Sequence, residues 1–488
     1  MSELARSVGL LSFRQAVLVV LGAARAKVAA SLLGPAGTGL LAQAASLLDL
    51  LRQVSMLGSA NGFLKIVAER YGRDDRTGLE RLLVTALALF GSLALVLAAA
   101  SVALAPRLAR WVFDDPGYAP LVVLVAVTLL FVVPKTLSAR VLSGSLHFRS
   151  YVQLAVVESL VALVAMAALA WRLGLTGAVA ALVVAEAAAL LLGVMLVRRH
   201  VVVPQRLRLR PAAADADTVR KLVRYAGALA LTSVAAAGST LLVRGEIIRA
   251  YGSEANGFYQ VAWQVGQNYL GILATSLWTY GMPKVATKLD DPAAVLALQN
   301  DFLRIALVVL APGIVALLAT RELWVPVLYT EVFLAAGTML CWQLAGELVA
   351  MMRQSMNISL LPRERLGFLV FQAVLYWGGW ALSSWLLLPR LGAVAVAFSY
   401  WAANLIALLA TYAYHRSALG YRVRRENVAL LAVVAPGFAL SVVLASRDDA
   451  VVGRAVPLAL AAAWVLWNLR LYGELLGVGR LARRGRER

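Results

Sequence analysis

Residues 10–33 read LLSFRQAVLVVLGAARAKVAASLL and are followed at residues 34–39 by the turn-forming sequence GPAGTG. The apolar run is long enough to cross a bilayer as a helix, which needs about 20 residues. It nevertheless contains Arg14, Arg25 and Lys27. A cation at the centre of such a helix costs about 2.5–3.5 kcal/mol even on translocon-insertion scales, so these residues normally face a cavity, a partner or a substrate. We therefore expect an anionic or polar cargo.

The composition of the whole chain agrees with a membrane protein. Of 488 residues, 61% are hydrophobic and 15% are charged, and the mean hydropathy is +0.79. These values exclude an ordinary soluble domain and predict an all-α polytopic membrane protein. The net charge of +20 is spread over short segments between apolar runs, which favours orientation against the cytoplasmic leaflet over nucleic-acid binding. With one cysteine, Cys341, an intramolecular disulfide is excluded.

Apolar runs near the spanning length predict about fourteen transmembrane helices. Their approximate limits are 10–33, 40–66, 80–105, 119–141, 149–171, 175–197, 220–250, 257–282, 302–320, 332–358, 366–388, 392–414, 428–446 and 452–471. The loops after the second, sixth and twelfth runs are rich in arginine, as is the C-terminal tail. All of these fall on one side of the membrane, so both termini are predicted to be cytoplasmic. The first helix is expected to be retained, because its apolar run is too long and too charged for a signal peptide.

An internal repeat organises these helices. The sequence GPAGTGLLAQ at 34–43 recurs in outline as GSEANGFYQ at 252–260, and the Asp74-Asp75 pair has its counterpart in Asp290-Asp291. Two six-helix blocks in the same orientation form two lobes related by an axis along the membrane normal, with the substrate path between them. The sequence thus predicts an N-lobe (1–203), a basic cytosolic linker (204–219), a C-lobe (220–420), and a C-terminal helix pair with a basic tail (421–488).

The chain resembles polysaccharide and O-antigen flippases of the multidrug/oligosaccharidyl-lipid/polysaccharide exporter superfamily. The features that carry this resemblance are the opening helix with embedded cations, the turn at 34–39 leading into LLAQ, and the six-plus-six repeat. These flippases are related to lipid II flippases. The resemblance covers most of residues 1–415. It implies a bacterial inner-membrane transporter that moves undecaprenyl-pyrophosphate-linked glycan to the outer leaflet by alternating access. Membrane lipids, a polysaccharide polymerase and assembly proteins are the further partners it implies.

The charges of the first two helices are the first candidate binding residues. Arg14 and Arg25 lie eleven residues apart, which returns to nearly the same helical face at 100° per residue. On the second helix, Asp49 and Arg52 are spaced to pair along one face. An ion pair between Arg25 and Asp49 is the alternative to direct substrate binding. Arginine forks suit a pyrophosphate, since they bind phosphate bidentately.

The second lobe offers further candidates. Arg244 ends the seventh predicted helix, and Gln260, Gln264 and Gln267 follow helical spacing on the eighth. This polar stripe suits sugar hydroxyls, although a hydrogen-bonding seam between helices explains it equally well.

Acidic residues in the apolar runs are the candidates for coupling transport to an ion gradient. Glu158 and Glu186 lie near mid-membrane on the fifth and sixth predicted helices. Such carboxylates carry protons or hold a sodium ion in transporters, or serve as neutral structural acids. We expect no cofactor and no structural or catalytic metal, with Na+ or H+ as the candidate coupling ion.

Two other functions fit parts of the sequence. A cation-coupled multidrug exporter of the same superfamily shares the fold, but such exporters usually have twelve helices. A membrane glycan polymerase or transferase needs a sizeable extramembrane site, whereas the predicted external loops are short. The chain also lacks a Walker A motif, so we expect a secondary transporter rather than an enzyme.

Overall fold

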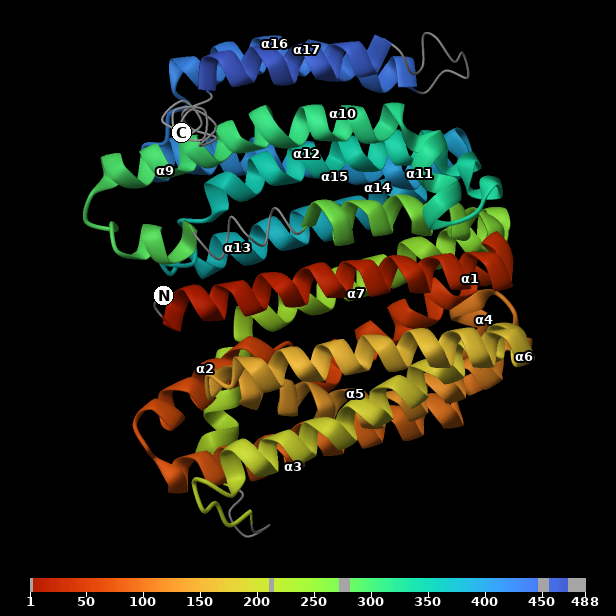
Figure 1. Cartoon of the computed structure of the whole chain (residues 1–488), viewed down its shortest axis with the longest axis vertical. Coiled ribbons are helices and arrows are strands. Elements are labelled where there is room, and N and C mark those ends of the chain that lie inside the picture. The colour runs from red at the N-terminus through yellow and green to blue at the C-terminus, as the bar shows by residue number, and fades with distance from the viewer. Residues whose placement is uncertain (1–2, 210–214, 272–280, 446–455, 473–488) are drawn as a thin grey trace, which may run out of the picture. The chain divides into compact units, whose positions relative to one another are not determined.

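The computed structural model describes residues 3–209, 215–271, 281–445 and 456–472, which are helical and contain no β-strand (Figure 1). The α-helices are α1 (Glu3–Ser55), α2 (Ala60–Gly72), α3 (Arg76–Ala103), α4 (Ala105–Phe113), α5 (Ala119–Gly144), α6 (Phe148–Val197), α7 (Ala216–Gln264), α9 (Pro292–Ile305), α10 (Ala311–Ala319), α11 (Arg321–Leu328), α12 (Gly337–Asn357), α13 (Leu366–Ala373), α14 (Gly379–Leu391), α15 (Ala395–Ala418), α16 (Arg425–Ala445) and α17 (Val456–Tyr472). Short 3₁₀ turns are η1 (Pro116–Tyr118), η6 (Glu331–Ala336) and η8 (Gly392–Val394), and π-helical turns are η2 (Arg198–Val202), η4 (Val265–Leu270), η5 (Ala306–Leu310) and η7 (Val374–Gly378).

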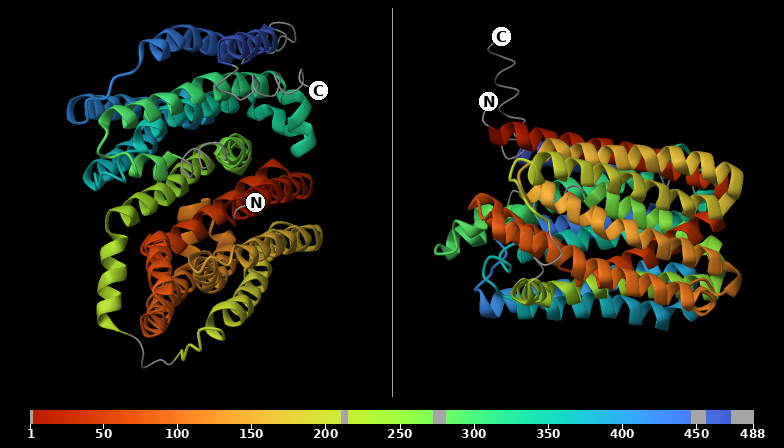
Figure 2. Two further views of the ribbon diagram at one scale, coloured as in Figure 1. Left: turned by 60° about the vertical axis from the view of Figure 1, so that its left-hand side comes forward. Right: turned by 90° about the horizontal axis from the view of Figure 1, so that it is seen from below.

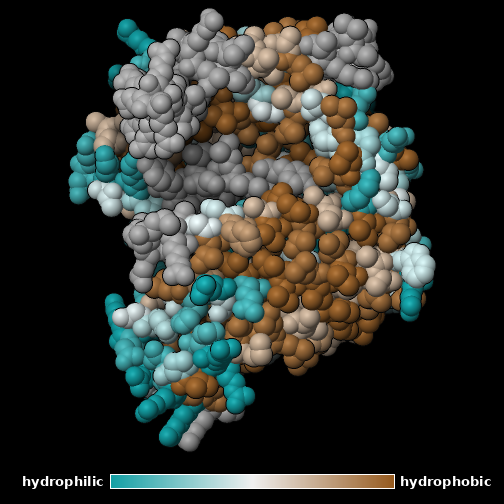
Figure 3. Space-filling model, viewed as in Figure 1, coloured by the Kyte–Doolittle hydropathy of each residue, from teal (hydrophilic) through white to brown (hydrophobic). Residues whose placement is uncertain are grey.

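Within the described ranges, nine helices are long and apolar enough to cross a membrane. Their apolar side chains are far from fully covered by the protein: 17% of the most apolar window of Ser12–Ser55 is buried, and 33% of that of Arg76–Ala103. Brown hydrophobic surface accordingly covers much of the face shown in Figure 3. Lipid is the natural cover for such surface, because a soluble protein rarely exposes apolar patches of this extent. The chain is a multi-pass membrane protein, as predicted.

The number of membrane crossings differs from the number of continuous helices. Across an internal bend, α6 joins the two predicted runs 149–171 and 175–197, and α1 joins the run 10–33 to the first part of the run 40–66, which ends in α2. Parts of the predicted runs 257–282, 428–446 and 452–471 lie outside the described residues. The count of about fourteen therefore stays a prediction.

The internal repeat is visible in the backbone. Gly34 bends α1 with φ 64°, and Gly252, 218 residues later, bends α7 with φ 81°. Gly174 bends α6 with φ 57°, and Gly392, again 218 residues later, has φ 65°. Positive φ values are easily reached by glycine alone, so each glycine lets an outgoing helix turn directly into a returning one. The same bends thus recur at the same spacing in both halves of the sequence.

The first pair of repeated turns is also in direct contact. A Cβ added to Gly39 would lie 2.1 Å from the carbonyl oxygen of Ser253, and one added to Gly257 would lie 2.0 Å from that of Pro35. Asn256 Nδ2 reinforces the contact by donating to Gly39 O at 2.7 Å. The turns at 34–39 and 252–257 therefore meet backbone to backbone, at a distance that glycine alone permits.

Replacing Gly39 by alanine is expected to destabilise the protein by about 1–3 kcal/mol, because the new methyl group would overpack against backbone that cannot rotate away. The measurement is the thermal unfolding midpoint of the purified protein in detergent. Gly22→Ala is the control, since a Cβ at Gly22 meets nothing within 4 Å. Equal midpoints for both variants would contradict the close approach of the two turns.

The contacts divide the chain into two compact units: Met1–Gln260 with Leu328–Thr330 and Trp377–Pro389 form unit 1, and Val261–Val327 with Glu331–Tyr376 and Arg390–Arg488 form unit 2. These units are defined by contacts, whereas the predicted lobes are defined by the repeat, so the lobe limits stay a prediction. In unit 1, α6 packs along both α1 and α5, and α3 packs along α5. In Figure 2 these red, orange and yellow helices run alongside one another.

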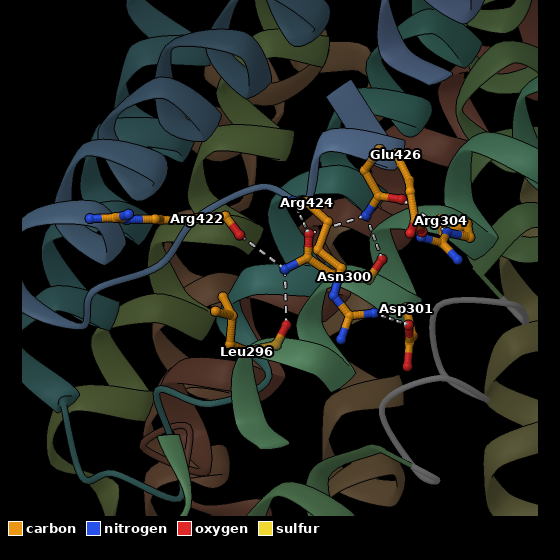
Figure 4. A network of polar contacts seen from close by, with 8 residues as sticks. Leu296, Asn300, Asp301, Arg304, Arg422, Arg424 and Glu426 are labelled. Atoms are coloured by element: carbon orange, nitrogen blue, oxygen red, sulfur yellow. Dashed lines mark hydrogen bonds and ion pairs between the residues drawn. The ribbon is translucent and has the colours of Figure 1, made fainter. Parts of the chain in front are cut away.

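In unit 2, α12 packs along α15, and α10 packs against α16 and α17. A buried polar network fastens the segment before α16 to α9 (Figure 4). Asn300 Nδ2 donates to Arg422 O at 3.1 Å, and Asn300 Oδ1 accepts from Arg424 N at 2.8 Å. Asn427 Nδ2 donates to Asn300 O at 2.8 Å, and Asn427 Oδ1 accepts from Arg304 Nε at 3.0 Å. The C-terminal helix pair is thus anchored by hydrogen bonds as well as by apolar packing.

Substituting Asn300 by alanine is expected to lower the free energy of unfolding by about 1–3 kcal/mol, because a buried N–H and a buried C=O would lose their partner. Asp301→Asn is the matched control. Asp301 pairs with Arg424 at 3.4 Å with both side chains 43% exposed, and such pairs contribute about 0–1 kcal/mol. Chemical unfolding followed by tryptophan fluorescence distinguishes the two variants. A larger loss for Asp301→Asn would mean that the surface pair, and not Asn300, holds this segment.

Candidate functional site

Two carboxylates in unit 1 share one ammonium group. Lys135 of α5 places its Nζ 3.0 Å from Glu158 Oε1 and 3.0 Å from Glu186 Oε2, both on α6. The three side chains are 12%, 29% and 15% exposed, respectively. Arg25 of α1 interacts electrostatically with both carboxylates. We call Arg25, Lys135, Glu158 and Glu186 the carboxylate cluster; it contains two positive and two negative charges.

A second group of cations surrounds Tyr151 at the start of α6. The guanidinium carbon of Arg14 lies 4.8 Å from the centre of the Tyr151 ring, a cation–π geometry. Arg140 of α5 lies within electrostatic range of Tyr151, Arg52 and Arg14. Arg52 forms an ion pair with Asp49, one turn earlier on α1. We call Arg14, Asp49, Arg52 and Arg140, with Tyr151, the arginine cluster.

The two clusters lie at different depths along the same helices. Tyr151 precedes Glu158 by seven residues on α6, which corresponds to about 10 Å at 1.5 Å per residue. Arg14 likewise precedes Arg25 on α1. The arginine cluster is therefore nearer the end of α1 that carries the N-terminus, and the carboxylate cluster lies further into the membrane-spanning part. Arg52 links them electrostatically, because its charge also acts on Glu186.

Together the clusters carry a surplus of positive charge. They contain five cations, namely Arg14, Arg25, Arg52, Lys135 and Arg140, against the three carboxylates Asp49, Glu158 and Glu186. The surplus of two lies in the arginine cluster, where Asp49 is the one acidic partner found in the described contacts. Arg14 Nε is buried without a hydrogen-bond partner in the structure. A diphosphate would supply both the missing acceptor and the missing negative charge.

Most of the candidates on the first six predicted helices are thus brought together. Arg14 and Arg52 join one cluster, and Arg25, Glu158 and Glu186 join the other. Asp49 forms its ion pair with Arg52, as its spacing indicated, and the alternative bridge from Asp49 to Arg25 is not among the ion pairs of the described residues. The roles of these residues in binding and coupling stay predictions.

Sequence reasoning missed Lys135 and Arg140 as site residues. Both lie inside the apolar run 119–141, so the argument applied to Arg14 and Arg25 would have identified them. Tyr151 carried no such signal, because aromatic residues near helix ends are common in membrane proteins.

Arg244 and Gln260 lie in a different environment of unit 1. Arg244 is 2% exposed, and its guanidinium donates to Asn256 Oδ1 at 3.2 Å and to Gln260 Oε1 at 2.6 Å. It also lies over the Tyr259 ring at 5.3 Å. These contacts join the two halves of α7 across the bend at Gly252. The predicted contact of Arg244 and Gln260 with substrate remains untested beside this structural role.

Gln264 and Gln267 belong to unit 2. Gln264 is half-buried. Gln267 Nε2 donates to Glu347 Oε1 at 3.2 Å, and Glu347 also accepts from Tyr400 Oη at 2.9 Å and from Gln343 Nε2 at 3.3 Å. Gln267 thus takes part in a hydrogen-bonding seam between helices, and the predicted sugar contacts of Gln264 and Gln267 stay predictions. Among the described residues, no group of three or more His, Cys, Asp or Glu is placed to hold a metal ion.

Comparisons with known proteins agree with this architecture. The profile of a family described as "Polysaccharide biosynthesis protein" matches residues 28–337. The lipid III flippase of Escherichia coli strain K12 is 23% identical over 375 residues, which cover 76% of this chain and 88% of that protein. The lipid III flippase of Shigella flexneri matches equally well.

Solved structures show the same fold at low sequence identity. The lipid II flippase MurJ, in an inward closed conformation, superimposes with a TM-score of 0.72 at 12% identity and covers 97% of this chain and 100% of its own. A multidrug-resistance transporter of the MATE family, in an inward-facing conformation, gives a TM-score of 0.68 at 13% identity and covers 85% of this chain and 98% of its own. The chain therefore shares the fold of these two transporters. Because the family profile matches well over half of the sequence, the chain belongs to the polysaccharide biosynthesis protein family.

Proposed function

We propose that this protein is a flippase that moves an undecaprenyl-pyrophosphate-linked oligosaccharide from the cytoplasmic to the outer leaflet of the bacterial inner membrane by alternating access. It thereby serves cell-surface polysaccharide synthesis, such as that of O-antigen, as a transporter and not as an enzyme. Both termini are then cytoplasmic, and a polysaccharide polymerase and assembly proteins act on the translocated product.

The observation that supports this proposal most is the positive surplus of the arginine cluster. A pyrophosphate carries negative charge on oxygens that match the fork of an arginine, and the interaction strengthens where water is scarce. The cluster lies towards the end of α1 that carries the N-terminus, which is the side where a lipid-linked sugar made in the cytoplasm would arrive. An organic cation, the cargo of many drug exporters, would be repelled there.

The decisive experiment identifies the lipid that copurifies with the protein by mass spectrometry and then measures its flipping in proteoliposomes. We expect a pyrophosphate-linked polyprenyl glycan to copurify and to reach the opposite leaflet faster than in protein-free vesicles. Transport of cationic drugs without lipid flipping would instead support the multidrug exporter. Elongation of the glycan chain in the same vesicles would support a polymerase or transferase.

For energy coupling we propose that Glu158 and Glu186 respond to H+ or Na+. Lys135 already lies at 3.0 Å from both carboxylates, so a sodium ion would have to displace its ammonium group, whereas proton exchange need not. Flipping is therefore compared with the proton gradient collapsed and with the sodium gradient collapsed. Loss of transport in the first case alone supports protons; loss in the second alone supports sodium; and no loss in either contradicts the coupling role.

A further inference from the structure

Unit 1 contains a large apolar pocket that the proposed function does not use. Its volume is about 830 Å³, and it is bounded by α2, α3, α5, α6, the π-helical turn η2 and the start of the linker. Leu83, Leu137 and Val194 are typical of its walls. Pockets of roughly 300–1,000 Å³ are the usual size for small ligands. The pocket is thus large enough for a hydrocarbon chain.

The pocket is lined by a face of α5 that does not include Lys135 or Arg140. Leu137, Ser138 and Val141 of α5 line it, and at 100° per residue they fall within an arc of about 100°. Lys135 and Arg140 each lie about 110° from the centre of that arc, on the two flanks of the opposite face. On α5, therefore, the residues that line the pocket and the residues of the charged clusters lie on different faces.

The rim of the pocket is open to the surroundings. Leu87 of α3 and Val194 of α6 line the pocket and are each 53% exposed. Both belong to helices apolar enough to span the membrane, so their exposed surface faces lipid. A cavity with such walls stays free of water and favours hydrocarbon, because burying each CH₂ group of a lipid chain removes apolar surface from water.

One charged side chain at the pocket indicates the charge of the headgroup that the ligand carries. Among the described residues that line the pocket, Arg198 is the one with a charged side chain, and it is exposed. It begins η2, a π-helical turn, and such turns occur frequently at functional sites. Figure 3 shows hydrophilic teal surface at the edge of the brown surface of unit 1, on the side where α2 lies. An anionic headgroup would complement the positive charge of Arg198.

We propose that this pocket binds a hydrocarbon chain of an anionic membrane phospholipid, whose phosphate is held by Arg198. The ligand is a phospholipid and not the flipped isoprenoid, because on α5 the pocket and the charged clusters lie on different faces. The bound chain also contacts Leu207 and Leu209, the start of the linker. Backbone bonds from Leu207 N to Val202 O at 2.9 Å and from Gln205 N to Val201 O at 3.1 Å already fold this segment back. The phospholipid thus fastens the start of the linker to α3, α5 and α6.

The test uses the full-length protein, delipidated in detergent and titrated with phosphatidylglycerol or phosphatidylcholine, with binding measured by native mass spectrometry. We expect phosphatidylglycerol to bind with higher affinity. Arg198→Gln is expected to weaken its binding by about tenfold or more, since hydrogen bonds to charged groups contribute about 1.5–3 kcal/mol. Arg199→Gln is the matched control, because Arg199 is exposed but does not line the pocket.

A second pair of variants tests the hydrocarbon site without touching the charge. Ala88 lines the pocket and is exposed, so Ala88→Trp should block the pocket and abolish phosphatidylglycerol binding. Ala99 lies further along the same exposed face of α3, outside the pocket. The control variant Ala99→Trp should therefore bind phosphatidylglycerol as the wild type does. An unchanged unfolding midpoint in lipid-free detergent verifies the fold of each variant. Equal binding of phosphatidylcholine, full binding by Arg198→Gln, or displacement of phosphatidylglycerol by equimolar undecaprenyl phosphate would each overturn the proposal.

Discussion

Replacing Arg14 by alanine is expected to slow lipid flipping by at least about tenfold, while the protein still folds. The guanidinium of Arg14 lies over Tyr151, and its Nε is buried without a hydrogen-bond partner. A charge-assisted hydrogen bond from this group to a phosphate would contribute about 1.5–3 kcal/mol, and every 1.4 kcal/mol corresponds to a factor of ten. The measurement is the initial rate of flipping of a pyrophosphate-linked glycolipid in proteoliposomes with equal protein content.

Two further variants separate charge from geometry at this position. Arg14→Lys keeps the positive charge but lacks the planar fork, so it should restore flipping in part. Arg107→Ala removes an exposed cation of α4 outside both clusters and should leave the rate unchanged. Arg25→Ala is expected to lose transport as Arg14→Ala does. Wild-type flipping rates in both Arg14→Ala and Arg25→Ala would show that these two arginines do not hold the cargo.

Replacing Lys135 by methionine is expected to destabilise the protein by about 3–5 kcal/mol, the usual result when one partner of a buried ion pair is removed. Methionine fills a similar volume, so the loss is one of charge. Glu186, whose side chain is 15% exposed, would then lie close to Glu158 without the ammonium group that now joins them. The measurement is the free energy of unfolding at neutral pH in detergent.

A double variant tests whether the effect belongs to the ion pairs. Lys135→Met combined with Glu186→Gln removes one buried negative charge together with the positive one, so it should recover at least half of the lost stability. Double-mutant cycles of this kind isolate the interaction from the separate effects of the two substitutions. If the losses simply add, the ammonium group does not stabilise Glu186, and the carboxylate cluster is not held together as described.

The sequence was most informative where an energetic cost marked single residues. Arg14 and Arg25 were found because cations in an apolar run are costly, and the structure places both within electrostatic range of further charges. Glu158 and Glu186 were found for the same reason. Their shared partner Lys135 was not, since pairing across helices depends on which helices pack together. Local patterns do not determine that packing.

The sequence was least informative about the three glutamines that follow the bend at Gly252. Helical spacing placed Gln260, Gln264 and Gln267 on one stripe. In the structure Gln260 is a partner of Arg244, whereas Gln267 is a partner of Glu347 and η4 interrupts the α-helix before it. A π-helical turn inserts a residue into the helical repeat and so changes the face on which later side chains lie. Spacing alone therefore could not establish a common surface.

The contact between the turns at 34–39 and 252–257 has a consequence for how this sequence can change over evolutionary time. In an ordinary core, a larger side chain at one position is compensated by a smaller one opposite. Here an added Cβ at Gly39 or Gly257 would meet backbone atoms, which no substitution on the other turn can make smaller. We expect these two glycines to persist through extensive divergence, so that in distant homologues they identify the duplicated turns after the remaining repeat sequence has become unrecognisable.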